Sequence, residues 1–164
     1  MIVLCKIYFQ MENKLDDIDF MILKELQKDG RASFTEIADR LKVSISNVRS
    51  RVTKLIEDKT IQIVGRINPQ NVGFNAYANI AVSVRPAKLI PNVIDTLMKM
   101  PEVSFLANTA GEFDIEVDIM SKNNEQLHQL VNQKIAKIEG VFQTKTTLYM
   151  KVHKYAQPDL DLVK

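Results

Sequence analysis

Residues Ser33–Leu55 have the sequence SFTEIADRLKVSISNVRSRVTKL, and this stretch decides the fold of the N-terminal third of the chain. Ser33, followed three residues later by Glu36, forms a capping box that begins a helix. After the short turn Lys42-Val43, Ser44 caps a second helix. The two helices carry apolar residues at helical spacing: Phe34, Ile37, Ala38 and Leu41 in the first, and Val48, Val52, Leu55 and Ile56 in the second. Two short helices joined by a tight turn indicate a helix-turn-helix.

A longer helix is predicted to precede this pair. Asp16 or Asp17 caps it, and its apolar stripe begins at Ile18. Lys28 lies in the last turn, and we expect Gly30 to end the helix in the left-handed conformation. The N-terminal third is therefore predicted to contain three helices.

The outer face of the third helix concentrates positive charge. Between Lys42 and Lys54 there are four basic residues and no acidic one, whereas the whole chain has a net charge of only +2. Arg and Lys neutralise phosphates or bind guanine, and Asn and Ser contact base edges or phosphates. The predicted DNA-binding residues on this element are Ser44, Ser46, Asn47, Arg49, Ser50, Arg51 and Lys54. The alternatives are an ordinary solvated face for Arg49 and Lys54 and an intradomain salt bridge for Arg51.

The segment Ile61–Pro69 predicts a strand, a turn and a strand. After a helix-turn-helix such a hairpin is a wing, and Arg66 on it is predicted to contact a DNA phosphate. Asn71 and Gly73 mark the linker that leaves this domain.

The rest of the chain predicts an α+β domain with the element order βαββαβ, a ferredoxin-like unit. The four strands are expected over Tyr77–Val84, Val103–Ala110, the stretch after the turn Gly111-Glu112, and Phe142–Val152. Apolar residues at helical spacing predict helices over Ile90–Met98 and Leu127–Ile138, and Gly140 ends the second of them.

The third strand has the clearest alternation. Phe113, Ile115, Val117 and Ile119 point to one face, and Asp114, Glu116 and Asp118 to the other. Both helices are expected to cover the same sheet face. The opposite face is then open to a partner, and a symmetric homodimer is the expected state.

Composition excludes several classes of function. The 164 residues contain one cysteine, Cys5, so no intramolecular disulfide forms, and Cys5, His128 and His153 are too few for a zinc site. The single cysteine favours a cytoplasmic setting. No apolar run approaches about 18 residues, so no membrane span is expected. The chain offers no acid/base pair, Cys/His pair or glycine-rich phosphate loop, so we predict neither an enzyme nor a bound cofactor.

The first ten residues, MIVLCKIYFQ, have two interpretations: an extra strand or tail, or an upstream extension of a protein whose translation starts at Met11. The predicted organisation follows the chain: an extension over residues 1–13, a winged helix-turn-helix domain over 14–66, a linker over 67–75, the βαββαβ domain over 76–153 and a C-terminal tail over 154–164.

Three stretches resemble the leucine-responsive regulatory protein/AsnC (Lrp/AsnC) transcription regulators: Leu15–Leu55, Arg66–Phe74 (RINPQNVGF) and Thr109–Ile119 (TAGEFDIEVDI). The resemblance implies a winged helix-turn-helix joined to a domain that pairs protomers and senses a small amino acid. It also implies dimers that assemble into octamers or other rings. By motif, the effector site is the T-x-G-x-x-D loop with Thr109, Gly111 and Asp114. A simpler interpretation of Asp114 is a polar residue on a solvated strand face.

Two residues depart from the family pattern. Lys59 stands where the family usually has Gly, which predicts a strained or different turn after the third helix. Val64 stands where an aromatic residue is common. Two other functions are alternatives: a tetrapyrrole decarboxylase of the same two-domain outline, for which only His128 and His153 are available, and an effector-independent architectural DNA-binding protein.

Overall fold

A computed structural model describes residues 15–163, which form two compact units. The first unit contains the residues up to Gly65 together with the C-terminal segment from Gln157, and the second runs from Arg66 to Ala156. The predicted extension over residues 1–13, and with it the alternative start at Met11, lies outside the described residues.

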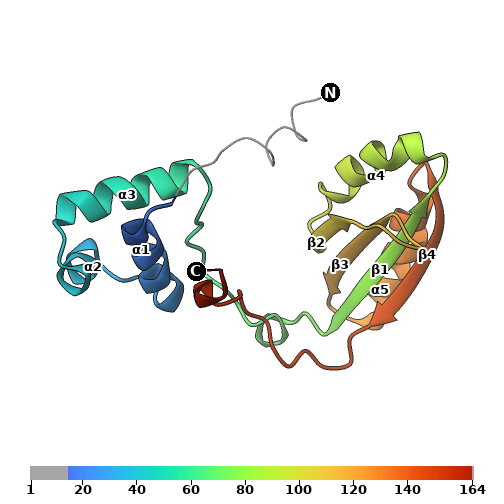
Figure 1. The fold of residues 1–164 in the computed structure, drawn as a ribbon. Helices are drawn as coiled ribbons and strands as arrows, with labels where there is room; N and C mark the ends of the chain where they lie inside the picture. The colour runs from blue at the N-terminus through green and yellow to red at the C-terminus, as the bar shows by residue number, and fades with distance from the viewer. Residues whose placement is uncertain (1–14, 164) are drawn as a thin grey trace. The chain divides into compact units, whose positions relative to one another are not determined.

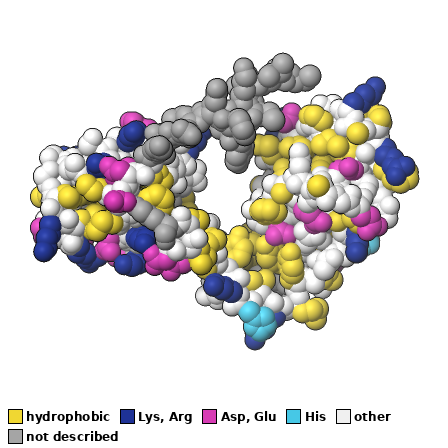
Figure 2. Space-filling view, viewed as in Figure 1, with side chains coloured by type: hydrophobic (Ala, Val, Ile, Leu, Met, Phe, Trp, Pro, Cys, Tyr) yellow, Lys and Arg dark blue, Asp and Glu magenta, His cyan; other side chains and the backbone are white. Residues whose placement is uncertain are grey.

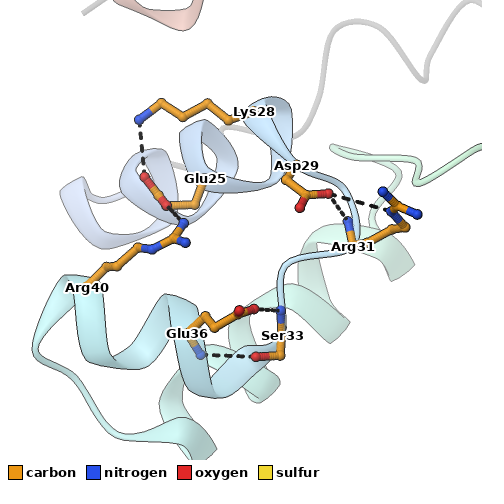
Figure 3. Close-up of polar contacts among 7 residues, drawn as sticks. All are labelled: Glu25, Lys28, Asp29, Arg31, Ser33, Glu36 and Arg40. Atoms are coloured by element: carbon orange, nitrogen blue, oxygen red, sulfur yellow. Dashed lines mark hydrogen bonds and ion pairs between the residues drawn. The ribbon is translucent and has the colours of Figure 1, made fainter.

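The first unit is built from three helices, α1 (Asp17–Lys28), α2 (Phe34–Leu41) and α3 (Ile45–Glu57) (Figure 1). Each begins at a side-chain cap. Asp16 caps α1, and Ser33 caps α2 through the predicted capping box with Glu36, which Figure 3 shows. Ser44 caps α3, because its Oγ accepts the N–H of Asn47 at 3.2 Å. The predicted three-helix arrangement is confirmed.

The apolar stripes of the three helices meet in one core. Its buried members are Ile22, Leu23, Leu26, Ile37, Ala38, Val48, Val52 and Leu55. The placement of Ile56 on the same apolar face of α3 is wrong, because Ile56 is 47% exposed. Each fully buried Val, Leu or Ile side chain contributes about 1.5–3 kcal/mol relative to an exposed one. This packing holds the outer face of α3 in a defined orientation.

The helix ends differ from the prediction at one residue. The expectation that Gly30 ends α1 in the left-handed conformation is wrong, because Gly30 is not among the positive-φ residues. Instead, Asp29 ends the helix in an extended conformation and its carboxylate accepts the N–H of Arg31 at 2.9 Å. Lys59, at φ 62°, does adopt the unusual left-handed turn expected after α3.

The predicted strand, turn and strand over Ile61–Pro69 is wrong. Residues 61–68 carry no strand. The segment lacks a two-residue turn of the Asn-Gly type that would fold it back on itself. Arg66, which was expected to contact a DNA phosphate, has another partner. Its guanidinium lies 4.4 Å from the Tyr155 ring centroid and donates to the Tyr155 carbonyl oxygen at 2.8 Å.

The C-terminal segment is part of the helical unit. Leu160 packs against the three-helix core, and Lys24 of α1 forms an ion pair with Asp161. Gln27 donates its side-chain N–H to the Pro158 carbonyl oxygen at 2.7 Å. The chain therefore passes between the two units twice, after Gly65 and again after Ala156.

The second unit has the predicted βαββαβ order. Its four-stranded antiparallel sheet has the strand order β2-β3-β1-β4. The elements are β1 (Ala76–Val84), α4 (Ile90–Leu97), β2 (Val103–Asn108), β3 (Ile115–Ser121), α5 (Asn124–Gln129) and β4 (Val141–Leu148). The second and fourth strands end earlier than predicted, at Asn108 and Leu148.

Both helices cover one face of this sheet, as predicted. Ile115, Val117 and Ile119 of β3 are fully buried and share a core with Val93 of α4 and Leu127 of α5. After α5 the chain continues through a π-helical turn, η3 (Leu130–Lys134), and a 3₁₀ turn, η4 (Ile135–Lys137). The predicted single helix to Ile138 is thus three pieces, since hydrophobic spacing does not distinguish helix types that all bury the same side.

Candidate functional site

The outward face of α3 follows from its buried side. Val48, Val52 and Leu55 point into the core. Since an α-helix turns 100° per residue, the opposite side carries three hydroxyl residues, Ser46, Ser50 and Thr53, and, at the C-terminal end of the helix, Glu57. Arg49 and Lys54 lie on either flank of this line, so α3 presents a line of hydroxyl groups between two cations.

The two flanking cations are available to an anion. Within residues 15–163, neither Arg49 nor Lys54 has an acidic partner. Arg49 makes one weak internal contact, with its guanidinium 6.0 Å from the ring centroid of Phe34 in α2. A cation without a carboxylate partner can neutralise a phosphate without first breaking an ion pair.

Arg51 is engaged inside the unit. Its Nη1 lies 2.7 Å from Asp16 Oδ2 and 2.7 Å from Asp19 Oδ1, and its Nε donates to Asn47 Oδ1 at 3.0 Å. Hydrogen bonds to Asp19 and Asp16 raise the pKa of Arg51 above its usual range. Arg51 therefore joins α3 to the beginning of α1, the salt-bridge role weighed from the sequence.

Cations on the other two helices are also paired. Glu25 of α1 accepts hydrogen bonds from Arg40 of α2 at 2.6 Å and from Lys28 at 3.2 Å, as Figure 3 shows. On the face seen in Figure 2, basic and acidic side chains are interspersed over the helical unit. The unpaired positive charge on α3 is thus a local feature of one helix.

The loop between β2 and β3 contains the other three predicted site residues, Thr109, Gly111 and Asp114. The Thr109 N–H donates to the Asp114 carbonyl oxygen at 3.0 Å, and the Thr109 hydroxyl donates to the Phe113 carbonyl oxygen at 2.7 Å. A Cβ at Gly111 would meet nothing within 4 Å. Open space therefore lies beside the backbone at Gly111.

Asp114 fastens this loop to β1. Its N–H donates to the Val82 carbonyl oxygen at 3.0 Å, and its Oδ2 accepts the Val84 N–H at 2.7 Å. One carboxylate oxygen thus has a structural partner. Asp114 is neither a purely solvated strand residue nor a carboxylate wholly available to a ligand.

The helix-free face of the sheet carries a polar and aromatic cluster around Asp118. This carboxylate accepts from the Tyr77 hydroxyl at 3.0 Å, the Asn79 amide at 3.1 Å and the Tyr149 hydroxyl at 3.3 Å. The two tyrosine rings lie 4.8 Å apart. Burial, followed by the bond to Asp118, raises the pKa of Tyr77 to about 12, so its hydroxyl stays protonated at neutral pH.

Family models match both units of this chain. A winged helix-turn-helix DNA-binding model covers residues 15–62, and the Lrp/AsnC ligand-binding domain covers residues 76–159, more than half of the chain. The chain belongs to the Lrp/AsnC family. The predicted family and the predicted α+β fold class are therefore both confirmed.

Similar regulators occur in archaea. An uncharacterised helix-turn-helix transcriptional regulator of Pyrococcus horikoshii is 38% identical over 143 residues, which span 87% of this chain and 90% of that one. The transcriptional regulator FL11 of Pyrococcus furiosus is 35% identical and covers 88% of this chain and 95% of its own length. This Lrp/AsnC chain is a transcription regulator with a DNA-binding helix-turn-helix and a ligand-binding domain.

Solved structures agree with this assignment. The leucine response regulatory protein of Mycobacterium tuberculosis aligns with a TM-score of 0.81 at 29% identity, over 88% of this chain and 98% of that one. A transcriptional regulator of Neisseria meningitidis, solved as a complex with L-methionine, aligns with a TM-score of 0.81 at 25% identity, over 90% of this chain and 99% of its own.

Sequence reasoning missed one exposed apolar residue at the beginning of α3. Ile45, the first residue of α3, is 43% exposed. In helix-turn-helix proteins, the N-terminal residues of the second helix of the motif face base edges, where an apolar side chain can contact the thymine methyl group. The signal that identifies Ile45 is an apolar residue that lies off the buried stripe of its helix. Thr53 is also exposed on the outward face of α3 and is not among the predicted contacts.

Replacing Arg51 with alanine should lower the stability of the helical unit rather than its affinity for DNA. The change removes the ion pairs to Asp16 and Asp19, and we expect a fall of roughly 5 °C in thermal midpoint. Circular dichroism melting and DNA titration across salt concentrations measure the two effects. A variant that melts like the wild type but loses salt-dependent binding would contradict the structural role.

The described residues offer little for a metal site, a membrane span or tetrapyrrole chemistry. No cluster of His, Cys, Asp and Glu that could hold a metal ion occurs among residues 15–163. Within the same range, no helix is long and apolar enough to cross a membrane. His128, a residue weighed for tetrapyrrole chemistry, lies on the exposed side of α5 with its Nε2 2.8 Å from the Asn132 amide.

Proposed function

We propose that this protein binds double-stranded DNA sequence-specifically through α3. The observation that carries the proposal is the pair of unpaired cations, Arg49 and Lys54, on either side of the hydroxyl line. The cations neutralise backbone phosphates and the small polar groups contact base edges. The proposed contacts are Ser44, Ser46, Asn47, Arg49, Ser50, Thr53, Lys54 and, through its exposed apolar side chain, Ile45.

Arg51 and Arg66 are left out of this set. The guanidinium of Arg51 is shared between two aspartates, and that of Arg66 is stacked on Tyr155. Releasing either guanidinium to bind a phosphate would forfeit these contacts. Their proposed role is to hold the framework that carries the DNA-binding residues.

We further propose that two protomers pair through the helix-free face of the sheet. Tyr77, Tyr149 and the 52%-exposed Phe105 supply aromatic surface there. Aromatic residues are enriched at protein interfaces. A symmetric pair presents two copies of α3, and two recognition helices can reach successive major-groove turns, about 34 Å apart. Larger assemblies of dimers, octamers among them, follow by analogy with the family.

The proposed effector of the ligand-binding domain is a small amino acid. The regulator of Neisseria meningitidis was solved with L-methionine, and the domain model matched here is a ligand-binding one. The proposed site is the loop with Thr109, Gly111 and Asp114, where Gly111 leaves space beside the backbone and Asp114 has a second carboxylate oxygen to offer an ammonium group. A cytoplasmic location and the absence of a resident cofactor stay predictions.

Replacing Asp114 with asparagine should abolish the response of DNA binding to amino acids without unfolding the loop. Asparagine removes the charge that would bind an α-ammonium group, while its amide oxygen can still accept the Val84 N–H. DNA titrations with and without each common amino acid measure the response, and analytical ultracentrifugation measures the assembly. Continued response in this variant would assign the effector to another carboxylate.

Genome-wide recovery of bound DNA, with and without added amino acids, tests the whole proposal. A regulator of this kind should enrich discrete sites and should change their occupancy when the effector is added. Recovery without sequence preference would overturn the specific-binding claim and favour an architectural DNA-binding protein. A decarboxylase would instead change the absorbance spectrum of an added tetrapyrrole, a result not expected from relatives that are transcriptional regulators.

A further inference from the structure

The second unit contains a cavity that none of the proposed functions uses. Its volume is about 410 Å³, and it opens at the end of the sheet where β3 finishes and α5 begins. Part of its lining is apolar: Phe74, Met120 and Leu130. The rest of the wall is polar or charged.

The polar wall is organised by the helix that follows β3. Gln126, Gln129 and Gln133 are spaced by three and four residues, so they lie along one side of α5 and of the π-helical turn η3. Single π-helical turns occur frequently at functional sites. Three carboxamides in a row provide both donors and acceptors for a polar ligand.

Charges of both signs line the same cavity. Lys122 and Lys134 supply two ammonium groups and Glu102 one carboxylate. Glu102 Oε1 pairs with Lys134 Nζ at 2.9 Å. This hydrogen bond outweighs the effect of burial and holds the pKa of Glu102 below its usual range. Glu102 Oε2 is buried and has no hydrogen-bond partner within residues 15–163. A buried carboxylate oxygen without a donor costs free energy that a ligand N–H could recover.

This cavity is separate from the loop of Thr109 and Asp114. That loop precedes β3, and the cavity lies beyond the last residues of the strand, Met120 and Ser121. β3 has seven residues, so at about 3.3 Å per residue the two places are roughly 20 Å apart. A small molecule bound at one place does not touch the other.

We propose that the cavity binds a small zwitterion, a molecule with one ammonium and one carboxylate group such as a free amino acid. The ammonium group binds Glu102, whose Oε2 accepts its N–H, and the carboxylate group lies between Lys122 and Lys134. The three glutamines hydrogen-bond the remaining polar atoms. This inference extends the proposed ligand sensing to a second place in the same domain and rests on that function only for its regulatory meaning.

Hydrogen–deuterium exchange of the full chain tests this site by position. The probes are the common L-amino acids, supplied one at a time, and their N-acetyl derivatives, which lack the ammonium group. At least one free amino acid should slow exchange in residues 120–134, and its N-acetyl derivative should not. Glu102→Gln should weaken the apparent affinity at least about tenfold, since it removes a charge-assisted hydrogen bond. Glu125→Gln, an exposed change on α5 outside the cavity, should leave it unchanged.

Protection confined to residues 109–114, or equal protection in the Glu102→Gln variant, would overturn the proposal, as would the absence of protection for every probe. A DNA titration on the same preparation separates this result from the fate of the proposed function. Specific DNA binding without protection at residues 120–134 would refute the cavity alone. Protection there in a chain that fails to bind DNA would leave the cavity standing and refute the proposed DNA binding through α3.

Discussion

Replacing both Arg49 and Lys54 with alanine is expected to weaken DNA binding about 10- to 100-fold at moderate salt. The two side chains flank the outward line of α3, and neither is neutralised by an acidic partner among the described residues. Each phosphate contact contributes roughly 0.9 to the slope of log affinity against log salt, so the slope should fall by about 1.8 per protomer. Fluorescence anisotropy over a salt series measures both quantities.

The matched control for that experiment changes charge elsewhere by the same amount. Lys99 and Lys137 are exposed in the second unit, far in sequence from α3. Their double alanine variant has the same net charge as the Arg49/Lys54 variant but should keep the wild-type slope. Equal losses in the two variants would mean that overall charge, rather than contact by α3, governs binding.

Replacing Gly140 with alanine is expected to destabilise the second unit by about 2–4 kcal/mol. Gly140 has φ +98°, a conformation that L side chains rarely adopt. A Cβ there would also lie 2.8 Å from the Leu89 Cβ and 3.4 Å from a Val84 methyl group, so the main chain or the core must shift. Urea unfolding followed by circular dichroism measures the loss.

Two other glycines separate the causes of that loss. Gly73 has nearly the same φ, +93°, but a Cβ there meets nothing within 4 Å, so Gly73→Ala should cost only the backbone strain, about 1 kcal/mol. Gly111→Ala, with open space and no positive φ, should change stability little. A Gly140→Ala variant no less stable than Gly73→Ala would show that Leu89 and the residues around it can shift at little cost to accommodate the added Cβ.

Helix α3 could be predicted because its determinants are local. Ser44 caps α3, the stripe Val48, Val52 and Leu55 faces the core, and the basic residues lie off that stripe. All of these follow from the spacing of residues in one helix. Residue spacing could not decide which cations lack an acidic partner and are therefore available to bind a phosphate. Arg49 and Arg51 are two residues apart, yet only Arg51 meets the carboxylates of Asp16 and Asp19, which come from a helix far away in sequence.

The ligand loop shows the same division. The motif with Thr109, Gly111 and Asp114 stands out in the sequence. The hydrogen bond that one Asp114 oxygen accepts from the Val84 N–H does not, because it depends on how β1 lies beside the loop. The cavity bounded by Glu102 and Lys134 gave no sequence signal at all. Its walls come from segments separated by up to 60 residues, from Phe74 to Lys134, and no local pattern relates them.

By itself the sequence determined the three helices, the βαββαβ order and the basic character of α3, because caps, hydrophobic periods and charge density act over one or two turns of chain. The tertiary structure alone decided that Ile61–Pro69 forms no hairpin, that Arg66 stacks on Tyr155 and that the C-terminal segment joins the helical unit. These outcomes depend on which distant groups compete for the same side chain or backbone. The outcome is decided only when the folding of each unit brings those groups within hydrogen-bonding distance.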